Sequence, residues 1–182
     1  MMTQEEYKKV ARMEHRTRIM QSLEAYRQCV YVVVYGSLRE GLGNSHFMEG
    51  TEFVKDATLK GFDMYPCSKY FDENMYPYCV IGDGEIKVSV YKLTRFRQMF
   101  ELDRLEGYPT LYNRKVVNID GINCWIYYLD TNSVDGKNKV NRLKDYKIED
   151  GNWRGWYKDN LMEYIKMLLL NYKNLEELEN NA

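Results

Sequence analysis

The spacing of apolar side chains along the chain predicts a helix at each end. Apolar residues recur every three or four positions over residues 3–27, and again over residues 161–178, which is the period of an amphipathic helix. Thr3 and Glu6 form a capping-box pattern at the start of the first segment. Both ends of the chain are therefore expected to be helical.

The middle of the chain carries strand signals and one more helix. Residues 29–35 are a continuous, β-branched apolar run, which suits a strand buried on both faces. A helix is expected over residues 94–105, because Gly107 ends its apolar pattern and Pro109 prevents its continuation.

Further strands are predicted in pairs. Short strands are expected over residues 52–61 and 64–70, and two hairpins are expected with turns at Gly82–Glu85 and Asp120–Gly121. The polar residues 131–144 predict a mobile loop. Strands in hairpins with few helices favour an α+β fold with a curved antiparallel or mixed sheet.

Composition and charge narrow the class of protein. The formal net charge is −1 over 182 residues, so charge predicts no attraction to nucleic acid or to an anionic membrane. No apolar run approaches the roughly 20 residues that span a bilayer, and the amino terminus lacks the apolar segment of a signal peptide. The chain has 4 cysteines, none in a C-x-x-C spacing, and 2 histidines, so a metal site is not expected. We expect free thiols in a cytoplasmic protein.

The first predicted helix is rich in lysine and arginine, which suggests two functions for it. It could dock a protein partner or an RNA. Glutamates dilute its charge, however, and helix faces of mixed sign usually face water. We therefore favour a solvated helix packed on its own domain.

The turn after the first strand is a candidate ligand site. Gly36 lets the backbone approach a ligand closely, and successive N–H groups in such a turn can point at an anion. The spacings of a phosphate loop, a dinucleotide fingerprint and a nucleophile elbow are all absent around it. On spacing alone an ordinary turn remains the simpler interpretation.

Glu106, at the end of the helix over residues 94–105, is a candidate general base. Its apolar and aromatic neighbours would let it lose part of its hydration, which raises the pKa of a carboxyl. A solvated carboxylate at a helix end is the simpler alternative. Asp103, three residues earlier, could repel Glu106, cap local structure or pair with Arg104 or Arg114.

Together the two segments resemble the gamma-glutamylcyclotransferase-like family, particularly its gamma-glutamylamine cyclotransferase branch. The family pattern V-Y/F-x-Y-G-S/T-L-K/R-x-G-x-x-N is matched by Val32–Asn44. The pattern L-D-x-L/F-E-G-Y/F-P, followed by Y-x-R, is matched by Leu102–Arg114. Ser89 departs from the family, which commonly has a glutamate there. The order of the parts, over residues 29–153, argues against chance more than any one motif does.

The resemblance implies both a fold and a reaction. The fold is a small mixed β-barrel or curved sheet with packed helices over residues 29–158, extended by helical segments at residues 1–28 and 159–182. In the reaction, the α-amine of a gamma-glutamyl group attacks its own side-chain amide and releases 5-oxoproline and a free amine. The nucleophile belongs to the substrate, so no cofactor is implied.

The same resemblance assigns roles to individual residues of an acyltransferase or lyase acting on a small molecule. Glu106 falls on the family's general acid/base. The substrate-binding positions fall on Tyr35, Gly36, Ser37, Leu38 and Tyr112.

Two other functions stay open at this point. One is a binding module of the same fold that has lost catalysis and recognises a small carboxylate ligand or a protein partner. The retained Glu106 argues against it, because a pure binder has little use for a desolvated base. The other is a docking protein whose function lies in the basic helix over residues 3–27. The leaving amine and the oligomeric state are left open by the sequence.

Overall fold

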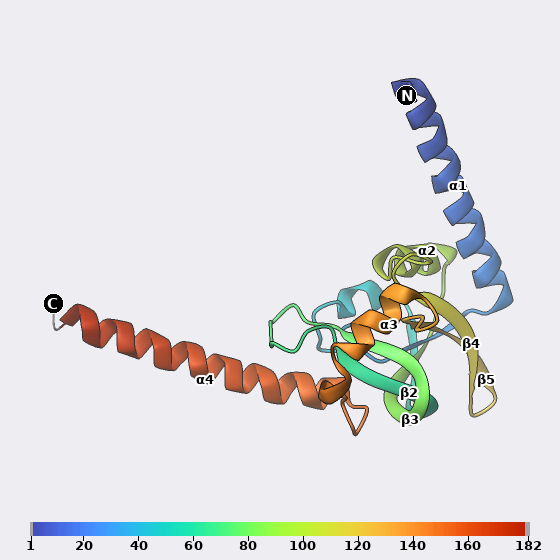
Figure 1. Cartoon of the computed structure of the whole chain (residues 1–182). Coiled ribbons are helices and arrows are strands. Elements are labelled where there is room, and N and C mark those ends of the chain that lie inside the picture. Colours follow the sequence, from blue (N-terminus) through green and yellow to red (C-terminus); the bar gives the residue numbers. More distant parts are fainter. Residues whose placement is uncertain (1, 181–182) are drawn as a thin grey trace.

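The computed structural model describes residues 2–180, without the side chains of residues 171 and 173–180, and has the expected α+β architecture (Figure 1). Short 3-10 turns, η1 at Ser45–Met48 and η2 at Lys144–Tyr146, interrupt the loops. The helices and strands are α1 (Gln4–Gln28), β1 (Tyr31–Val34), β2 (Glu52–Pro66), β3 (Pro77–Lys92), α2 (Phe96–Leu105), β4 (Asn113–Ile119), β5 (Ile122–Tyr128), α3 (Val134–Asn141) and α4 (Trp153–Asn180).

Five strands form one mixed sheet in the order β2-β3-β1-β5-β4. The central strand β1 pairs antiparallel with β3 and parallel with β5. Val32, Val33 and Val34 are each buried, which confirms the prediction of a strand covered on both faces. One core cluster packs β1 and β5 against α1 and α2, and the other packs the opposite face against the start of α4.

β2 and β3 are single long strands, whereas the sequence predicted shorter ones. The prediction of a hairpin turn at Gly82–Glu85 is wrong. The pairing passes from Lys60 opposite Glu85 to Phe62 opposite Ile81, so the intervening residues of β3 form a bulge. The Asp63 carboxylate occupies this space and accepts a hydrogen bond from the Gly84 N–H at 3.1 Å. The glycines make room for a side chain from the neighbouring strand.

The second hairpin is confirmed, whereas the loop expected over residues 131–144 contains the helix α3. Asp120 and Gly121 both have positive φ, 50° and 88°, as a two-residue β4–β5 turn requires. The Ser133 side chain caps α3 by accepting a hydrogen bond from the Gly136 N–H at 3.0 Å. This cap lets a short polar segment form a helix.

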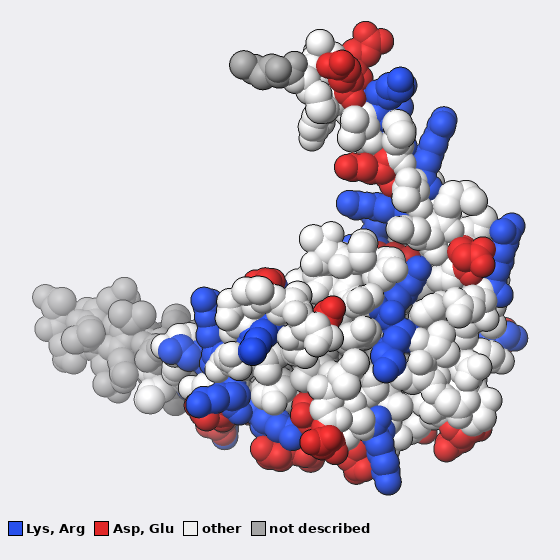
Figure 2. All heavy atoms as spheres, turned by 45° about the vertical axis from the view of Figure 1, so that its right-hand side comes forward, with Lys and Arg blue, Asp and Glu red and all other residues white. Residues whose placement is uncertain are grey.

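The predicted α1 and its capping box are confirmed, but only the end of the helix is packed. Ser22 and Ala25 are buried, whereas Tyr7 and Met13 are 68% and 60% exposed. The amino-terminal half projects away from the sheet (Figure 1). In Figure 2, acidic and basic side chains alternate along it, so its charge forms no uniformly basic surface on the face shown. The expectation of a helix packed on its own domain holds for its last turns.

α4 begins at Trp153, earlier than the sequence predicted, because two tryptophans anchor its first turn. Trp153 is fully buried and stacks on Trp156 with ring centroids 4.9 Å apart. The helix then extends away from the core, and Leu169 is 58% exposed (Figure 1). Among the described residues, none of the helices has both the length and the apolar character that crossing a bilayer requires.

Gly151 joins α4 to the sheet and admits no larger residue. Its φ is +59°, and a Cβ there would lie 2.1 Å from the Glu85 carbonyl oxygen. We expect Gly151→Ala to lower the free energy of unfolding by about 3 kcal/mol or more, because strain and collision add. Gly121→Ala is the matched control: its φ is +88° with no atom within 4 Å of the added Cβ. It should cost only about 1–2 kcal/mol. If chemical denaturation showed equal losses of unfolding free energy for the two variants, the added Cβ at residue 151 would not collide with the Glu85 carbonyl.

Candidate active site

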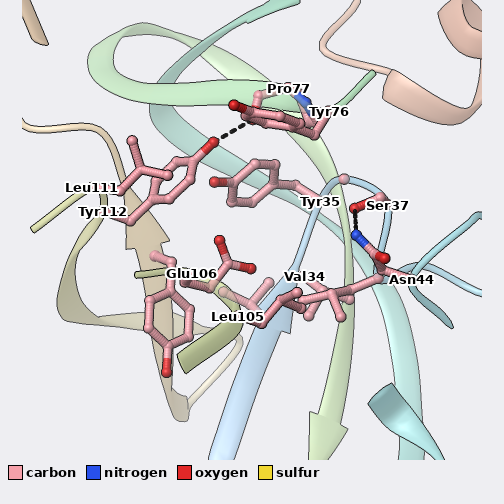
Figure 3. Close-up of a pocket in the computed structure, with 14 residues that line it drawn as sticks. Val34, Tyr35, Ser37, Asn44, Tyr76, Pro77, Leu105, Glu106, Leu111 and Tyr112 are labelled. Atoms are coloured by element: carbon pink, nitrogen blue, oxygen red, sulfur yellow. Dashed lines mark hydrogen bonds between the residues drawn. The ribbon is translucent and has the colours of Figure 1, made fainter. Parts of the chain in front are cut away.

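A cavity of about 280 Å³ opens where the end of β1, the end of α2 and the start of β3 meet (Figure 3). All six residues that the sequence singled out lie in its wall, although they come from distant parts of the chain. These are Tyr35, Gly36, Ser37, Leu38, Glu106 and Tyr112. Sequence reasoning missed three further lining residues, Tyr76, Pro77 and Tyr127, which no local pattern marks.

The turn after β1 fits tightly against the opposite wall of the cavity. A Cβ at Gly36 would lie 2.7 Å from Cγ of Pro77, so this position requires glycine for space. Asn44 holds the turn from behind: its N–H donates to the Ser37 carbonyl at 3.0 Å and its Nδ2 donates to Ser37 Oγ at 2.9 Å. The turn is therefore rigidly placed.

The backbone donors of this turn are free. Within residues 2–180, the N–H groups of Gly36, Ser37 and Leu38 donate to no protein acceptor. Buried or half-buried N–H groups without a partner cost free energy unless a ligand or water accepts from them. Successive N–H groups of this kind form a concave site for a carboxylate or an oxyanion.

Glu106 is the residue that follows α2, and its side chain enters the cavity. Its N–H donates to the Leu102 carbonyl at 2.9 Å, and Gly107, with φ +61°, then reverses the chain. Figure 3 shows its carboxylate directed toward Tyr35 and Tyr112. None of the described residues donates a hydrogen bond to it.

The electrostatics of Glu106 follow from this isolation. Burial raises the pKa of its carboxyl from 4.5 to about 7, because the charged form has lost water without gaining a donor. The negative end of the α2 dipole acts in the same direction. Near neutral pH the group is thus present in both protonation states, as a residue that takes up and returns a proton should be.

Two tyrosines form the wall opposite Glu106. The Tyr112 hydroxyl donates to the Pro77 carbonyl at 2.9 Å, which fixes its ring. Burial raises the pKa of Tyr35 and of Tyr112 well above 10, and the nearby Glu106 charge adds to this. Both side chains are therefore neutral at physiological pH and make the cavity largely apolar.

Asp103 lies behind the cavity, and its partner settles an alternative that the sequence left open. It forms a buried ion pair with Arg114. The same carboxylate accepts hydrogen bonds from the Tyr127 hydroxyl at 2.7 Å and from Ser22 Oγ at 2.6 Å.

No three His, Cys, Asp or Glu side chains in the described part of the chain are grouped as metal ligands would be.

Comparison with known proteins identifies the family. A family model described as "Gamma-glutamyl cyclotransferase, AIG2-like" matches residues 32–155. The chain belongs to this family. The gamma-glutamylcyclotransferase family protein YtfP of Escherichia coli K12 is 30% identical over 122 residues, which cover 67% of this chain and 94% of that protein.

Two solved structures have a similar fold. The solution structure of the Escherichia coli protein YtfP has a TM-score of 0.50 and 27% identity, covering 68% of this chain and 96% of that one. The crystal structure of an uncharacterized protein from Pyrococcus horikoshii has a TM-score of 0.53 at 22% identity, covering 73% and 97% of the two chains. The second likeness concerns the fold alone.

Ser89 stands where the family pattern commonly has a glutamate, and a carboxylate is instead supplied by the adjacent strand. Ser89 lies opposite Asp56 in the β2–β3 pairing and donates to its carboxylate at 2.6 Å. Both residues contact Arg39, which follows the cavity turn and is 5% exposed. The Ser89 hydrogen bond, with the Arg39 charge, lowers the pKa of Asp56. A carboxylate from β2 thus anchors the turn.

The raised pKa of Glu106 predicts how stability depends on pH. An acid whose pKa is higher in the folded than in the unfolded state stabilises the fold at pH values below its unfolded-state pKa. This stabilisation is lost as the pH rises through the folded-state pKa. Glu106→Gln removes that titration. Relative to the wild type, the variant should gain about 1–3 kcal/mol of unfolding free energy between pH 4.5 and about 7.

Glu101→Gln is the control for this measurement. Glu101 lies on the same helix but forms an ion pair with Arg97 at 2.7 Å on the outer surface. Denaturation across this pH range should show no relative gain for Glu101→Gln. A Glu106→Gln curve parallel to that of the wild type would show that the carboxyl is not destabilised by burial.

Proposed function

We propose that the protein is a gamma-glutamyl cyclotransferase, which releases 5-oxoproline and a free amine from a gamma-glutamyl amine or a small gamma-glutamyl peptide. One observation carries the proposal. A carboxyl with a pKa of about 7 shares a cavity with a turn whose backbone donors are unoccupied. Membership of the gamma-glutamyl cyclotransferase, AIG2-like family supports the same reaction.

The first step of the reaction needs a base. The α-ammonium of the substrate transfers a proton to Glu106, and the freed amine attacks the carbon of the side-chain amide. A C–N bond forms and closes the five-membered ring, while the carbonyl electrons move to oxygen. The N–H groups of the Gly36 turn are suited to hold that oxyanion or the substrate carboxylate.

The second step needs an acid, and the same residue supplies it. Protonated Glu106 returns its proton to the nitrogen of the scissile amide, the C–N bond to that nitrogen breaks, and the carbonyl re-forms. The attacking nitrogen gives up its second proton to the departing amine, so the products are the lactam and an ammonium ion, and Glu106 is again ionised. Because nucleophile and electrophile belong to one molecule, holding them in an attacking geometry supplies much of the acceleration.

The gamma-glutamylamine branch is the finer part of the proposal. Of the described residues that line the cavity, Glu106 is the one that carries a charge. A leaving group with a carboxylate of its own would therefore meet no cation there, and Glu106 would repel it. This favours a leaving amine without a carboxylate over the carboxylate-bearing part of a peptide.

Glu106→Gln should reduce the rate of 5-oxoproline release by about 100-fold or more, because an amide cannot take up the proton. In the wild type, kcat/KM should rise with pH through about 7 as Glu106 ionises. Release of 5-oxoproline from a panel of gamma-glutamyl amides, amines and peptides measures both. Glu101→Gln should behave like the wild type. Near-normal turnover in Glu106→Gln contradicts the assignment, and binding without any release favours an inactive binding module.

Gly36→Val tests the turn that lines the cavity together with Glu106. The added side chain collides with Pro77, so the turn must move and its donors with it. We expect KM to rise by about tenfold or more, which corresponds to the loss of one or two hydrogen bonds. Gly43→Ala, in the same loop, is the control because a Cβ there meets no atom within 4 Å. An unchanged KM in Gly36→Val would exclude this turn from substrate binding.

A further inference from the structure

The helix α1 lies outside residues 32–155, which the family model matches, yet its last turns pack against α2, the helix that precedes Glu106. Ser22 is 1% exposed at this contact. A hydroxyl so deeply buried needs an acceptor, since burial without one costs about 1–3 kcal/mol. The acceptor of Ser22 is therefore informative.

The Ser22 hydroxyl has one proton and two acceptors within reach. Its Oγ lies 3.0 Å from the Arg18 carbonyl on its own helix and 2.6 Å from Oδ2 of Asp103 on α2. Hydrogen bonds to an ionised acceptor are shorter and stronger than those to a carbonyl. The geometry thus places the proton on the line to Asp103, and the bond joins α1 to α2.

Asp103 carries the connection to the cavity. Its Oδ1 accepts from the Tyr127 hydroxyl at 2.7 Å and from the Arg114 guanidinium. Tyr127 lines the cavity, and Asp103 lies nearly one helical turn before Glu106. With its hydroxyl committed to Asp103, Tyr127 donates nothing to Glu106.

Two further hydrogen bonds hold α1 to the strands that carry these groups. Arg114 Nη2 donates to the Gln21 carbonyl at 3.1 Å, and Trp125 Nε1 donates to the Ala25 carbonyl at 3.0 Å. The last turns of α1 thereby contact β4 and β5 as well as α2. A helix outside the family-matched segment completes a buried polar network behind the cavity.

We propose that Ser22 is a positioning residue, which acts through Asp103 to hold Tyr127 and the Glu106 turn in the geometry that the reaction needs. The kinetic part of this inference rests on the proposed function. It assigns α1 a role in turnover, although α1 itself contributes no residue to the cavity wall.

A double-variant cycle with Ser22→Ala and Tyr127→Phe tests the connection in the full-length chain. We expect kcat for 5-oxoproline release to fall about three- to tenfold in Ser22→Ala, with KM changed less than twofold. Because both residues act through one carboxylate, the double variant should lose much less than the product of the two single losses. Thr17→Ala is the matched control, since the exposed Thr17 hydroxyl donates at 3.0 Å to the Met13 carbonyl of its own helix and forms no hydrogen bond across the described part of the fold.

The same cycle is read a second time as shifts of the denaturation midpoint, which need no activity. The shift of the double variant should be smaller than the sum of the two single shifts, whereas the shifts of Thr17→Ala and Tyr127→Phe should add. The proposal would be overturned if the effects of Ser22→Ala and Tyr127→Phe were additive, or if the kcat of Ser22→Ala equalled that of Thr17→Ala. If the wild type releases no 5-oxoproline, the proposed function fails, and the midpoints alone still decide whether Ser22 and Tyr127 are coupled.

Discussion

Desolvation of the Glu106 carboxylate is the constraint on which the rest of the site depends. A carboxylate placed among donors would have an ordinary or lowered pKa and would hold its proton too weakly to return it at neutral pH. Two of the nearby hydroxyl groups donate to other acceptors: Tyr112 donates to the Pro77 carbonyl and Tyr127 donates to Asp103. The free N–H groups belong to the Gly36 turn of the same cavity, where a substrate rather than the protein can accept from them.

Much of the fold could be predicted because its signals are local. The β-branched run of β1, the capping box of α1 and the Asp120–Gly121 turn each depend on neighbours in sequence. Prediction failed where distant residues decide. The glycines of β3 look like a turn but accommodate Asp63 from β2, and the length of β2 follows from its pairing with β3. α3 is an exception: its Ser133 cap is a local signal, but the polar composition of residues 131–144 predicts a loop.

The candidate site was predictable to the same extent. Glu106 and the Gly36 turn stand out in the sequence through motifs, and the fold brings them to one cavity. For Asp103 the sequence leaves capping, repulsion of Glu106 and pairing with Arg104 or Arg114 open, because the choice depends on how β4 packs beside α2. Nothing local marks Ser22 or Tyr127, since each acquires its role only from a hydrogen bond across the fold.

The pKa of Glu106 decides whether this carboxyl can act as both the base and the acid of the site. Titration of glutamate side chains labelled with 13C at the carboxyl, followed by nuclear magnetic resonance, would report it in the intact protein, and Glu106→Gln would assign its resonance by loss. We expect a midpoint near 7, well above the ordinary value of 4.5. A midpoint at the ordinary value would show a solvated or hydrogen-bonded carboxylate and would contradict its role as the acid and base of the site.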